Sequence, residues 1–430
     1  MTTELPLRPN MGHLKRRAKN LLKAHQQGDA DACPILRQLR RFNQSSDAQI
    51  LTAQVQLNEV QFALALDYGF SSWNSLKHHV EQIAFTGDEV VVHRLDGEVW
   101  IDGIPKLSWS SPGACTFIGA LLRALNRIGE RVNYTDLMGL SGAAFRFCFA
   151  HPNWDWSSVD GMLGYDHGQA AMDALGYEAG WAEGDKEMRA AFIKSIDEGR
   201  PALGIDLVQA AEWGVIAGYA DEGKTLLCRT YFDDPGDDYM RTERLPWLNY
   251  IIGERKPAPT RHASLLASLR IAVTYARGEG FVSSGGCSYK RGLEGLETWI
   301  ADLLDESRFD AGDADGFCKH ASINRFVFDS LLDAREAAAR YLATHSELLG
   351  PDLQSSLMQL AGIYGQVVAV LRECEQYVPK DEGLGPLDWT PAVRRAQVDA
   401  LHSVVAHERE ALRVCEQILS RSQRGKDTEQ

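Results

Sequence analysis

A cysteine at the start of an amphipathic helix is the residue of this chain best suited to covalent chemistry. Cys115 follows the stretch 110–114, and apolar residues then recur at helical spacing from Phe117 to Ile128. The first N–H groups of a helix are unpaired and carry the positive end of its dipole, so a thiol placed there is expected to ionise more readily. The pattern makes Cys115 a candidate nucleophile, with a half-buried thiol that caps the helix as the alternative.

A short buried strand from Trp213 to Tyr219 follows a glutamate and is expected to face the cysteine helix. Glu212 is a poor base for a thiol, because its usual pKa of about 4.3 lies far below the thiol value of about 8.5. Burial against Trp213 would raise the pKa of Glu212, whereas a charged carboxylate would repel a thiolate. Glu212 is therefore predicted to be a base or a ligand contact, with a structural carboxylate bonded to backbone N–H groups as the alternative.

Two histidines in the loop-like stretch 151–168 could supply an imidazole base. His151 and His167 lie there among tryptophans and aspartates, and a catalytic dyad depends on geometry rather than on order in the chain. His151 is therefore kept as a candidate catalytic residue. A metal held by His151, Asp155 and Asp160 would have a spacing that fits no familiar site, so no metal is expected.

Four tryptophans flank these positions and suggest a binding site for a cyclic or cationic small molecule. If their rings converge they would form an aromatic pocket, with ordinary core packing as the alternative for each ring. Arg146 ends a run of small residues that begins at Ser141, and it could bind a ligand carboxylate through two hydrogen bonds or form a structural ion pair. The candidate ligand-binding residues are Trp109, Arg146, Trp154, Trp156, Trp213 and Tyr219.

The composition indicates a cytoplasmic protein of two or three domains. The chain has 430 residues, of which 44% are hydrophobic and 24% charged. It shows no run of 18 apolar residues and no charged-then-apolar leader, so no membrane partner is expected. The net charge of −14 argues against general nucleic-acid binding. The eight cysteines form no CxxC spacing and are expected to be reduced, and the glycines around 280–286 form no GxGxxG motif, so no cofactor is expected.

Residues 1–84 are predicted to form a small all-helical module. Helices are expected over 14–25, near 30–42, over 47–66 and from 76 onward. The stretch 8–41 carries nine Lys or Arg residues and two Asp residues. That basic excess could contact an acidic protein partner or phosphate, and a solvated helix face is the alternative.

The remainder is predicted to form an α+β domain over 85–257, an antiparallel helical bundle over 258–421 and a disordered tail over 422–430. Strands are expected within 89–104, around an Asp96-Gly97 turn, and over 202–208, 213–219 and 225–231. Helices are expected over 115–128, 134–140 and 185–197, and then over 263–277, 293–305, 322–346, 353–378 and 391–420.

Several runs of the sequence carry a resemblance to known proteins. The cysteine that opens a helix at 115–125 and the strand pattern 212–219 resemble the papain-like fold of the N-terminal domain of the butirosin-biosynthesis acyltransferase and of bacterial double-glycine leader peptidases. The runs 115–120, 138–146 and 289–299 more closely resemble a group of uncharacterised bacterial proteins with that fold. The runs 14–22 and 68–77 resemble a helical module often found ahead of ankyrin arrays, and this resemblance implies no chemistry.

The papain-like resemblance implies a cysteine-dependent enzyme, but the sequence departs from that pattern. In the peptidases a histidine begins the strand that ends in Gly-Tyr, and Glu212 occupies that position here. The resemblance places the orienting carboxylate at Asp233 or Asp234. No Gln lies between 86 and 114 to complete an oxyanion hole, so Ser110 or Ser111 would have to serve.

These observations lead to three hypotheses for a protein of papain-like α+β fold with an N-terminal helical module and a C-terminal helical bundle. In the first, Cys115 attacks a small acyl donor or amide to give a thioester, which an amine or water resolves. In the second, the protein is catalytically silent and binds a small-molecule ligand in the same cleft. In the third, it is a regulatory protein that acts through its basic module. The candidate catalytic residues are Cys115, Glu212, Asp233 and His151.

Overall fold

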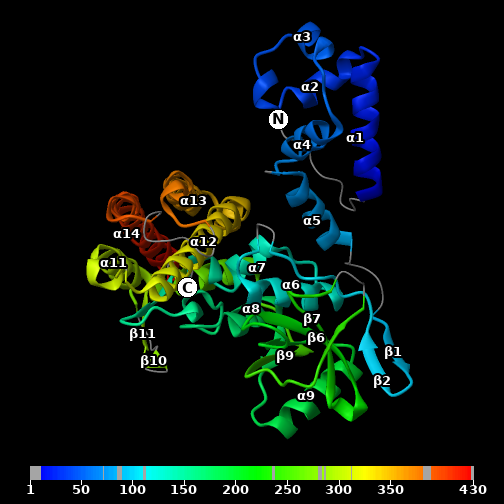
Figure 1. The fold of residues 1–430 in the computed structure, drawn as a ribbon, viewed down its shortest axis with the longest axis vertical. Coiled ribbons are helices and arrows are strands. Elements are labelled where there is room, and N and C mark those ends of the chain that lie inside the picture. The colour runs from blue at the N-terminus through cyan, green and yellow to red at the C-terminus, as the bar shows by residue number, and fades with distance from the viewer. Residues whose placement is uncertain are drawn as a thin grey trace. The chain divides into compact units, whose positions relative to one another are not determined.

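The computed structural model describes residues 11–70, 72–84, 90–109, 113–234, 238–278, 283–284, 287–310, 312–380 and 389–427. The chain forms two compact units (Figure 1). The first is built mainly from the chain up to residue 91, and the second mainly from residue 92 onward.

The N-terminal unit is helical throughout its described part. Its helices are α1 (Met11–Gln26), α2 (Cys33–Leu36), α3 (Asp47–Thr52), α4 (Leu57–Asp67) and α5 (Trp73–Ala84). The single helix predicted over 47–66 is wrong, because two helices with separate N-caps occupy this stretch. Ser46 and Gln56 each begin a capping box that satisfies the first N–H groups of α3 and α4. Buried apolar side chains such as Leu14, Ile50 and Leu64 form the core of this unit.

The second unit contains an antiparallel sheet of eight strands, which confirms the predicted α+β class. The described sheet has the order β1-β2-β6-β5-β9-β4, and β7 pairs with both β6 and β8. These strands are β1 (Val92–Leu95), β2 (Glu98–Ile101), β4 (Tyr177–Gly180), β5 (Ala202–Ile205), β6 (Trp213–Ala220), β7 (Thr225–Arg229), β8 (Met240–Thr242) and β9 (Leu248–Arg255). The predicted turn at Asp96-Gly97 joins β1 and β2, and both residues have positive φ, as such a turn requires.

Helices cover both faces of this sheet. On one face, Phe117 of α6 (Thr116–Arg127) packs edge-on against Trp213 of β6 and Tyr250 of β9. On the other, Phe192 of α9 (Asp185–Asp197) packs against Ile216 and neighbouring apolar side chains. Figure 1 shows α6, α7 (Tyr134–Leu140) and α8 (His167–Leu175) on the opposite side of the sheet from α9. The cysteine helix is thus held on the sheet by its own apolar stripe.

The C-terminal half is mainly helical, as predicted. Its helices are α10 (Arg261–Ala276), α11 (Gly292–Leu304), α12 (Ala314–Thr344), α13 (Pro351–Cys374) and α14 (Pro391–Asp427). In the figure, α11 to α14 gather in one layer beside the sheet (Figure 1). Helix α14 extends to Asp427, through part of the stretch 422–430 that was predicted to be a disordered tail. Residues 428–430 lie outside the described residues.

The expectation that only helices follow residue 258 is wrong. The strands β10 (Ser283–Ser284) and β11 (Cys287–Arg291) form a small sheet with β3 (Cys148–His151). Because β11 pairs with a strand from the first half of the unit, the predicted boundary at 257/258 falls inside one compact unit rather than between two. Local apolar periodicity could not reveal a partner strand more than a hundred residues away.

A buried ion pair ties the helical layer to the segment before β3. Arg335 of α12 pairs with Glu408 of α14 at 2.5 Å, and both side chains are almost fully buried. The Arg335 guanidinium also donates to the carbonyl oxygens of Ala144 (3.1 Å) and Arg146 (2.9 Å). Such a pair is costly to break, since removal of one partner leaves the other charged in an apolar environment.

We predict that Glu408→Gln lowers the free energy of unfolding by about 3–5 kcal/mol, because it leaves the Arg335 charge buried without its counter-ion. Glu297→Gln is the matched control, since Glu297 pairs with Arg409 at an exposed position, where such pairs contribute about 0–1 kcal/mol. Chemical denaturation of both variants measures the difference. Equal losses would show that the Arg335–Glu408 pair has no special role.

Candidate functional site

The N–H groups just ahead of α6 are already bonded to a buried carboxyl and a buried hydroxyl. The N–H of Gly113 donates to Asp333 Oδ1 at 3.1 Å, and the N–H of Cys115 donates to the Tyr134 hydroxyl at 3.0 Å. That hydroxyl donates in turn to Asp333 Oδ2 at 2.6 Å. The Asp333 carboxylate of α12 therefore fixes this turn directly and through Tyr134. As a result, the backbone N–H that would serve a Cys115 oxyanion intermediate is occupied.

The Cys115 thiol lies over the start of α6, but it is buried. The N–H of Ile118 bonds to the thiol, and a β-carbon at Gly161 would lie only 2.7 Å from the sulfur. Burial raises the pKa of Cys115 to about 12, outweighing the Ile118 N–H and the Arg146 charge, which both lower it. The expectation of a readily ionised thiol is therefore wrong. The loss of hydration destabilises the thiolate more than the positive end of the helix stabilises it.

Glu212 reaches the cysteine helix, as the sequence led us to expect. Its carboxyl, just ahead of β6, bonds to the side chain of Thr116, the residue after Cys115. The pKa of Glu212 is raised to about 7, mainly by burial and in smaller part by the nearby charge of Asp160, while the bond to Thr116 lowers it. This half-buried carboxyl can thus hold or release a proton near neutral pH.

Asp160 is a member of the site that the sequence did not single out for this role. Its Oδ2 accepts a hydrogen bond from the Trp213 indole at 3.1 Å, and its Oδ1 accepts one from the N–H of Met162 at 2.6 Å. Burial raises the pKa of Asp160, and its charge acts on both Cys115 and Glu212. We refer to Cys115, Tyr134, Asp160, Glu212 and Asp333 together as the polar centre.

Arg146 has a structural role beside this centre. The side chain is buried, donates to the carbonyl oxygen of Ser158 and lies 3.5 Å from the hydroxyl of Ser330. Its charge lowers the pKa of both Cys115 and Asp160. Because the side chain is buried, Arg146 stabilises negative charge on Cys115 and Asp160 and does not contact a ligand at the surface.

The four predicted tryptophans occupy separate environments, so the aromatic pocket expected from them is wrong. Trp154 is buried in the helical layer and donates to Asp302, whereas Trp213 is buried against Phe117. Trp156 is partly exposed and meets Phe326 edge-on at 5.3 Å. These tryptophans lie in different parts of the fold, so their rings do not converge on the cysteine.

Trp109 is the exception, because it borders the polar centre through a tyrosine that the sequence did not suggest. Trp109 is 51% exposed, and the centroid of its ring lies 4.4 Å from that of Tyr231. Negative charge on Cys115 or on Glu212 would raise the pKa of Tyr231, and a β-carbon at Gly119 would lie 2.5 Å from its hydroxyl oxygen. Burial raises the pKa of Tyr231 well above its usual value, so it is a neutral hydroxyl at this site.

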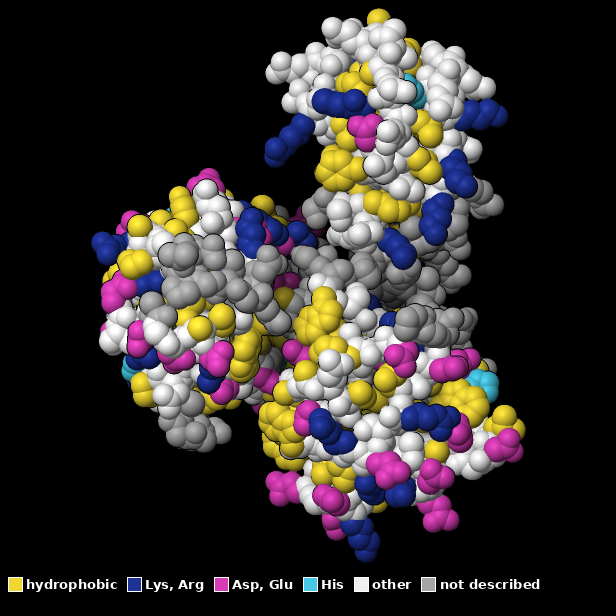
Figure 2. Space-filling view, in the orientation of Figure 1, with side chains coloured by type: hydrophobic (Ala, Val, Ile, Leu, Met, Phe, Trp, Pro, Cys, Tyr) yellow, Lys and Arg dark blue, Asp and Glu magenta, His cyan; other side chains and the backbone are white. Residues whose placement is uncertain are grey.

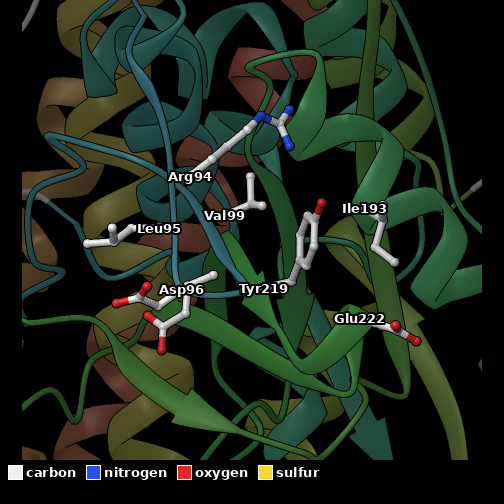
Figure 3. Close-up of a pocket in the computed structure, with 9 residues that line it drawn as sticks. Arg94, Leu95, Asp96, Val99, Ile193, Tyr219 and Glu222 are labelled. Carbon is white, nitrogen blue, oxygen red and sulfur yellow. The ribbon is translucent and has the colours of Figure 1, made fainter.

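Tyr219 lies away from the polar centre because β6 is irregular. Trp213 and Tyr219 would share a face of a regular strand, but the register shifts between Ile216 and Gly218. The Tyr219 hydroxyl consequently donates to Asp197 of α9 at 2.9 Å. There it lines a separate pocket of about 580 Å³, in which Figure 3 shows it between Arg94, Ile193 and Glu222.

The other predicted catalytic residues have structural partners elsewhere. His151 Nδ1 lies 3.0 Å from Asp302 Oδ2, and Asp233 pairs with Arg229 at 3.2 Å while it accepts the N–H of Thr230. Burial lowers the pKa of His167 to about 3, so that imidazole is neutral. Among the described residues no hydrogen bond joins an imidazole to Cys115, and the proposed oxyanion donors Ser110 and Ser111 lie outside them.

Comparison with protein-family models and with curated proteins gives no match. Within the described ranges no helix has the length and apolar character needed to cross a bilayer, and no three His, Cys, Asp or Glu side chains are grouped so that they could hold a metal ion. The chemistry open to the polar centre is set by its own side chains and the adjoining Tyr231. They are three carboxyls whose pKa values are raised by burial (Asp160, Glu212 and Asp333), a neutral thiol and two neutral phenols.

We predict that Cys115 reacts slowly with iodoacetamide at pH 8, because a thiol with a pKa of about 12 supplies almost no thiolate there. Cys318 is only half-buried and should be labelled before Cys115. Mass spectrometry of the labelled peptides measures both rates. Labelling of Cys115 ahead of Cys318 below pH 8 would contradict the buried thiol and favour a nucleophile.

We predict that Glu212 makes the protein less stable as the pH rises from about 4.5 to 7. Its folded pKa is raised to about 7 from a usual value of 4.5, so the folded state binds the extra proton and loses that advantage as the proton leaves. In the wild type this effect lowers the free energy of unfolding by about 2 kcal/mol between pH 5 and 8, and Glu212→Gln should abolish that decrease. Denaturation at both pH values tests this, with exposed Glu183→Gln as control; unchanged pH dependence in Glu212→Gln would contradict it.

Proposed function

We propose that the protein binds a small cationic or amine-bearing molecule at the mouth of the polar centre, with Glu212 as its charged contact. The observation that carries this proposal is a half-buried carboxyl of pKa about 7 at the start of the cysteine helix, next to a second buried carboxyl. Loss of the Glu212 proton leaves a charge with little solvent to stabilise it. A ligand cation would supply the missing counter-charge.

The balance of charge around Glu212 supports a cation over an anion. Asp160 and Asp333 contribute two further carboxyls, while Arg146 supplies the positive charge felt by Cys115 and Asp160. The Asp333 carboxylate is already bonded to Gly113 and Tyr134, and the two Asp160 oxygens are bonded to Trp213 and Met162, so Glu212 is the carboxyl that remains for a ligand. An amine or guanidinium group would therefore be attracted to the site, whereas a ligand carboxylate would be repelled.

The aromatic pair next to Glu212 gives such a ligand a wall to pack on. Trp109 and Tyr231 have ring centroids 4.4 Å apart, and Phe232 meets Trp109 edge-on at 6.1 Å. Aromatic faces attract cations and also cover the apolar body of a cyclic molecule. With half of the Trp109 ring exposed, this wall is accessible from solvent.

The papain-like architecture belongs to the same proposal. A cysteine that begins a helix packed on an antiparallel sheet, with Glu212 at the start of the adjacent strand β6, is the arrangement that the resemblance implies. Under this proposal the scaffold is retained for binding while the thiol is silent. No disulfide joins the cysteines that the structure describes, which accords with the cytoplasmic location proposed here.

Acyl transfer by Cys115 is the second candidate, and one observation favours it. The Ile118 N–H is directed at the Cys115 sulfur, so the helix would stabilise a thiolate once formed. Glu212, with a pKa of about 7, would take the thiol proton, and the sulfur would add to the carbonyl carbon of an acyl donor and expel its leaving group. This route requires a ligand that displaces Tyr134 from the Cys115 N–H.

We predict that aminoglycosides or aliphatic diamines raise the melting temperature at pH 8, where Glu212 is charged, more than at pH 6, where it is largely protonated. Glu212→Gln should abolish the shift and Trp109→Ala should weaken binding by about fivefold, because a cation on an aromatic face is worth about 1 kcal/mol. Glu183→Gln serves as the matched control. Equal shifts in Glu212→Gln and in the control would refute the proposed site.

The variant Cys115→Ser distinguishes amine binding from acyl transfer. The serine variant should bind the same amines with unchanged affinity if the site only binds. A thioester adduct on wild-type Cys115 after incubation with an activated acyl donor, detected by intact mass and absent from Cys115→Ser, would replace the binding proposal with the catalytic one.

A further inference from the structure

Helix α1 of the N-terminal unit carries basic side chains and no acidic ones. Its sequence, MGHLKRRAKNLLKAHQ, contains five Lys or Arg residues. Three of them, Lys15, Lys19 and Lys23, are spaced four residues apart, and all three are exposed. Residues four apart lie on the same face of a helix, about 6 Å apart along its axis. These three lysines therefore form a row that is inclined to the helix axis, which we call the lysine ridge.

The ridge differs from three arginines of the same unit, which have partners. Arg17 donates to the Tyr68 hydroxyl and lies over its ring, Arg37 pairs with Asp47, and Arg41 pairs with Glu59 at 2.8 Å. Within the described part of the chain, no carboxylate forms an ion pair with a ridge lysine. Figure 2 shows dark blue side chains in a row along the side of this unit where α1 runs.

The fold holds the ridge rigid. On the inner side of α1, Leu14 and Ala18 are buried in the core of the unit, and the buried His25 ring lies 2.8 Å from the carbonyl oxygen of Ile50. The helix can neither rotate nor bend without exposing these groups. The spacing of the three charges is thus set by the helix and not by a mobile segment.

The ridge is unfavourable for the helix that carries it. Like charges four residues apart repel each other, and this row contains two such pairs, Lys15 with Lys19 and Lys19 with Lys23. An acidic residue on α1 would relieve the repulsion, yet the helix has none. A local arrangement that works against stability is the kind expected where a surface serves binding.

We infer that the lysine ridge is a docking surface for an acidic helix of a partner protein. A helix with Glu or Asp at every fourth position repeats its charge at the same interval of about 6 Å, so three ion pairs form in register along one face. Nucleic acid fits less well. Three lysines would neutralise about three phosphates, too few for firm binding at physiological salt, and the chain as a whole carries a charge of −14.

The test uses the full-length chain and two triple variants that change the net charge equally. Lys15→Gln/Lys19→Gln/Lys23→Gln removes the ridge, and the control Lys186→Gln/Lys194→Gln/Lys319→Gln removes three exposed helical lysines of the other unit. The probe is a fluorescein-labelled helical peptide with glutamate at every fourth position, followed by fluorescence anisotropy. A duplex DNA of similar length is titrated in parallel.

We expect the ridge variant to bind the acidic peptide at least tenfold more weakly than the wild type, and the control variant to bind within twofold. The ridge variant should melt at the same temperature or higher, because two repulsive pairs are removed. Equal weakening in both variants would overturn the inference by showing a general charge effect. A fall in melting temperature would overturn it in favour of a structural role, and tighter binding of DNA than of the peptide would overturn the choice of partner.

Discussion

One buried carboxylate sets the geometry on which the candidate site depends. Asp333 lies on α12, far along the chain from the turn at residues 113–115, yet it accepts the Gly113 N–H and holds the Cys115 N–H through the Tyr134 hydroxyl. Unpaired N–H groups at a buried helix start are costly, so this carboxylate stabilises α6 where it meets the helical layer. The same bonds occupy the donor that a cysteine nucleophile would need. The contact that supports the helix thereby limits the chemistry of its first residue.

Burial acts on Cys115 and Glu212, two titratable groups of the polar centre, in the same direction but with opposite consequences. It raises the pKa of the Cys115 thiol to about 12, which leaves a neutral and poorly nucleophilic group at neutral pH. It raises the pKa of the Glu212 carboxyl to about 7, which makes that group responsive to pH and to a nearby cation. A dipole at a helix start is a weaker influence than the loss of water, so the sequence pattern that suggested a thiolate pointed to the right position and the wrong protonation state.

Much of the secondary structure could be predicted because it depends on local patterns. The apolar spacing from Phe117 onward, the Asp96-Gly97 turn and the long stripes of α12, α13 and α14 are each visible within a few turns of chain. The predictions that were wrong concern features that do not depend on the local pattern. β11 exists because it pairs with β3, and a register shift within β6 sends Tyr219 to the face opposite Trp213. Neither a distant strand partner nor an irregular register leaves a clear signal in apolar periodicity.

In the candidate site, too, some features follow from the local sequence and others from tertiary contacts. The sequence by itself determined that a cysteine opens an amphipathic helix, that a glutamate precedes the neighbouring strand and that α1 bears lysines at helical spacing, because all three follow from residue type and local periodicity. Only the tertiary structure decided that Asp333, Tyr134, Asp160 and Tyr231 surround that cysteine while His151 and Asp233 do not. The hydration and the electrostatic environment of a residue depend on which distant side chains contact it, and the order of residues along the chain does not specify those contacts.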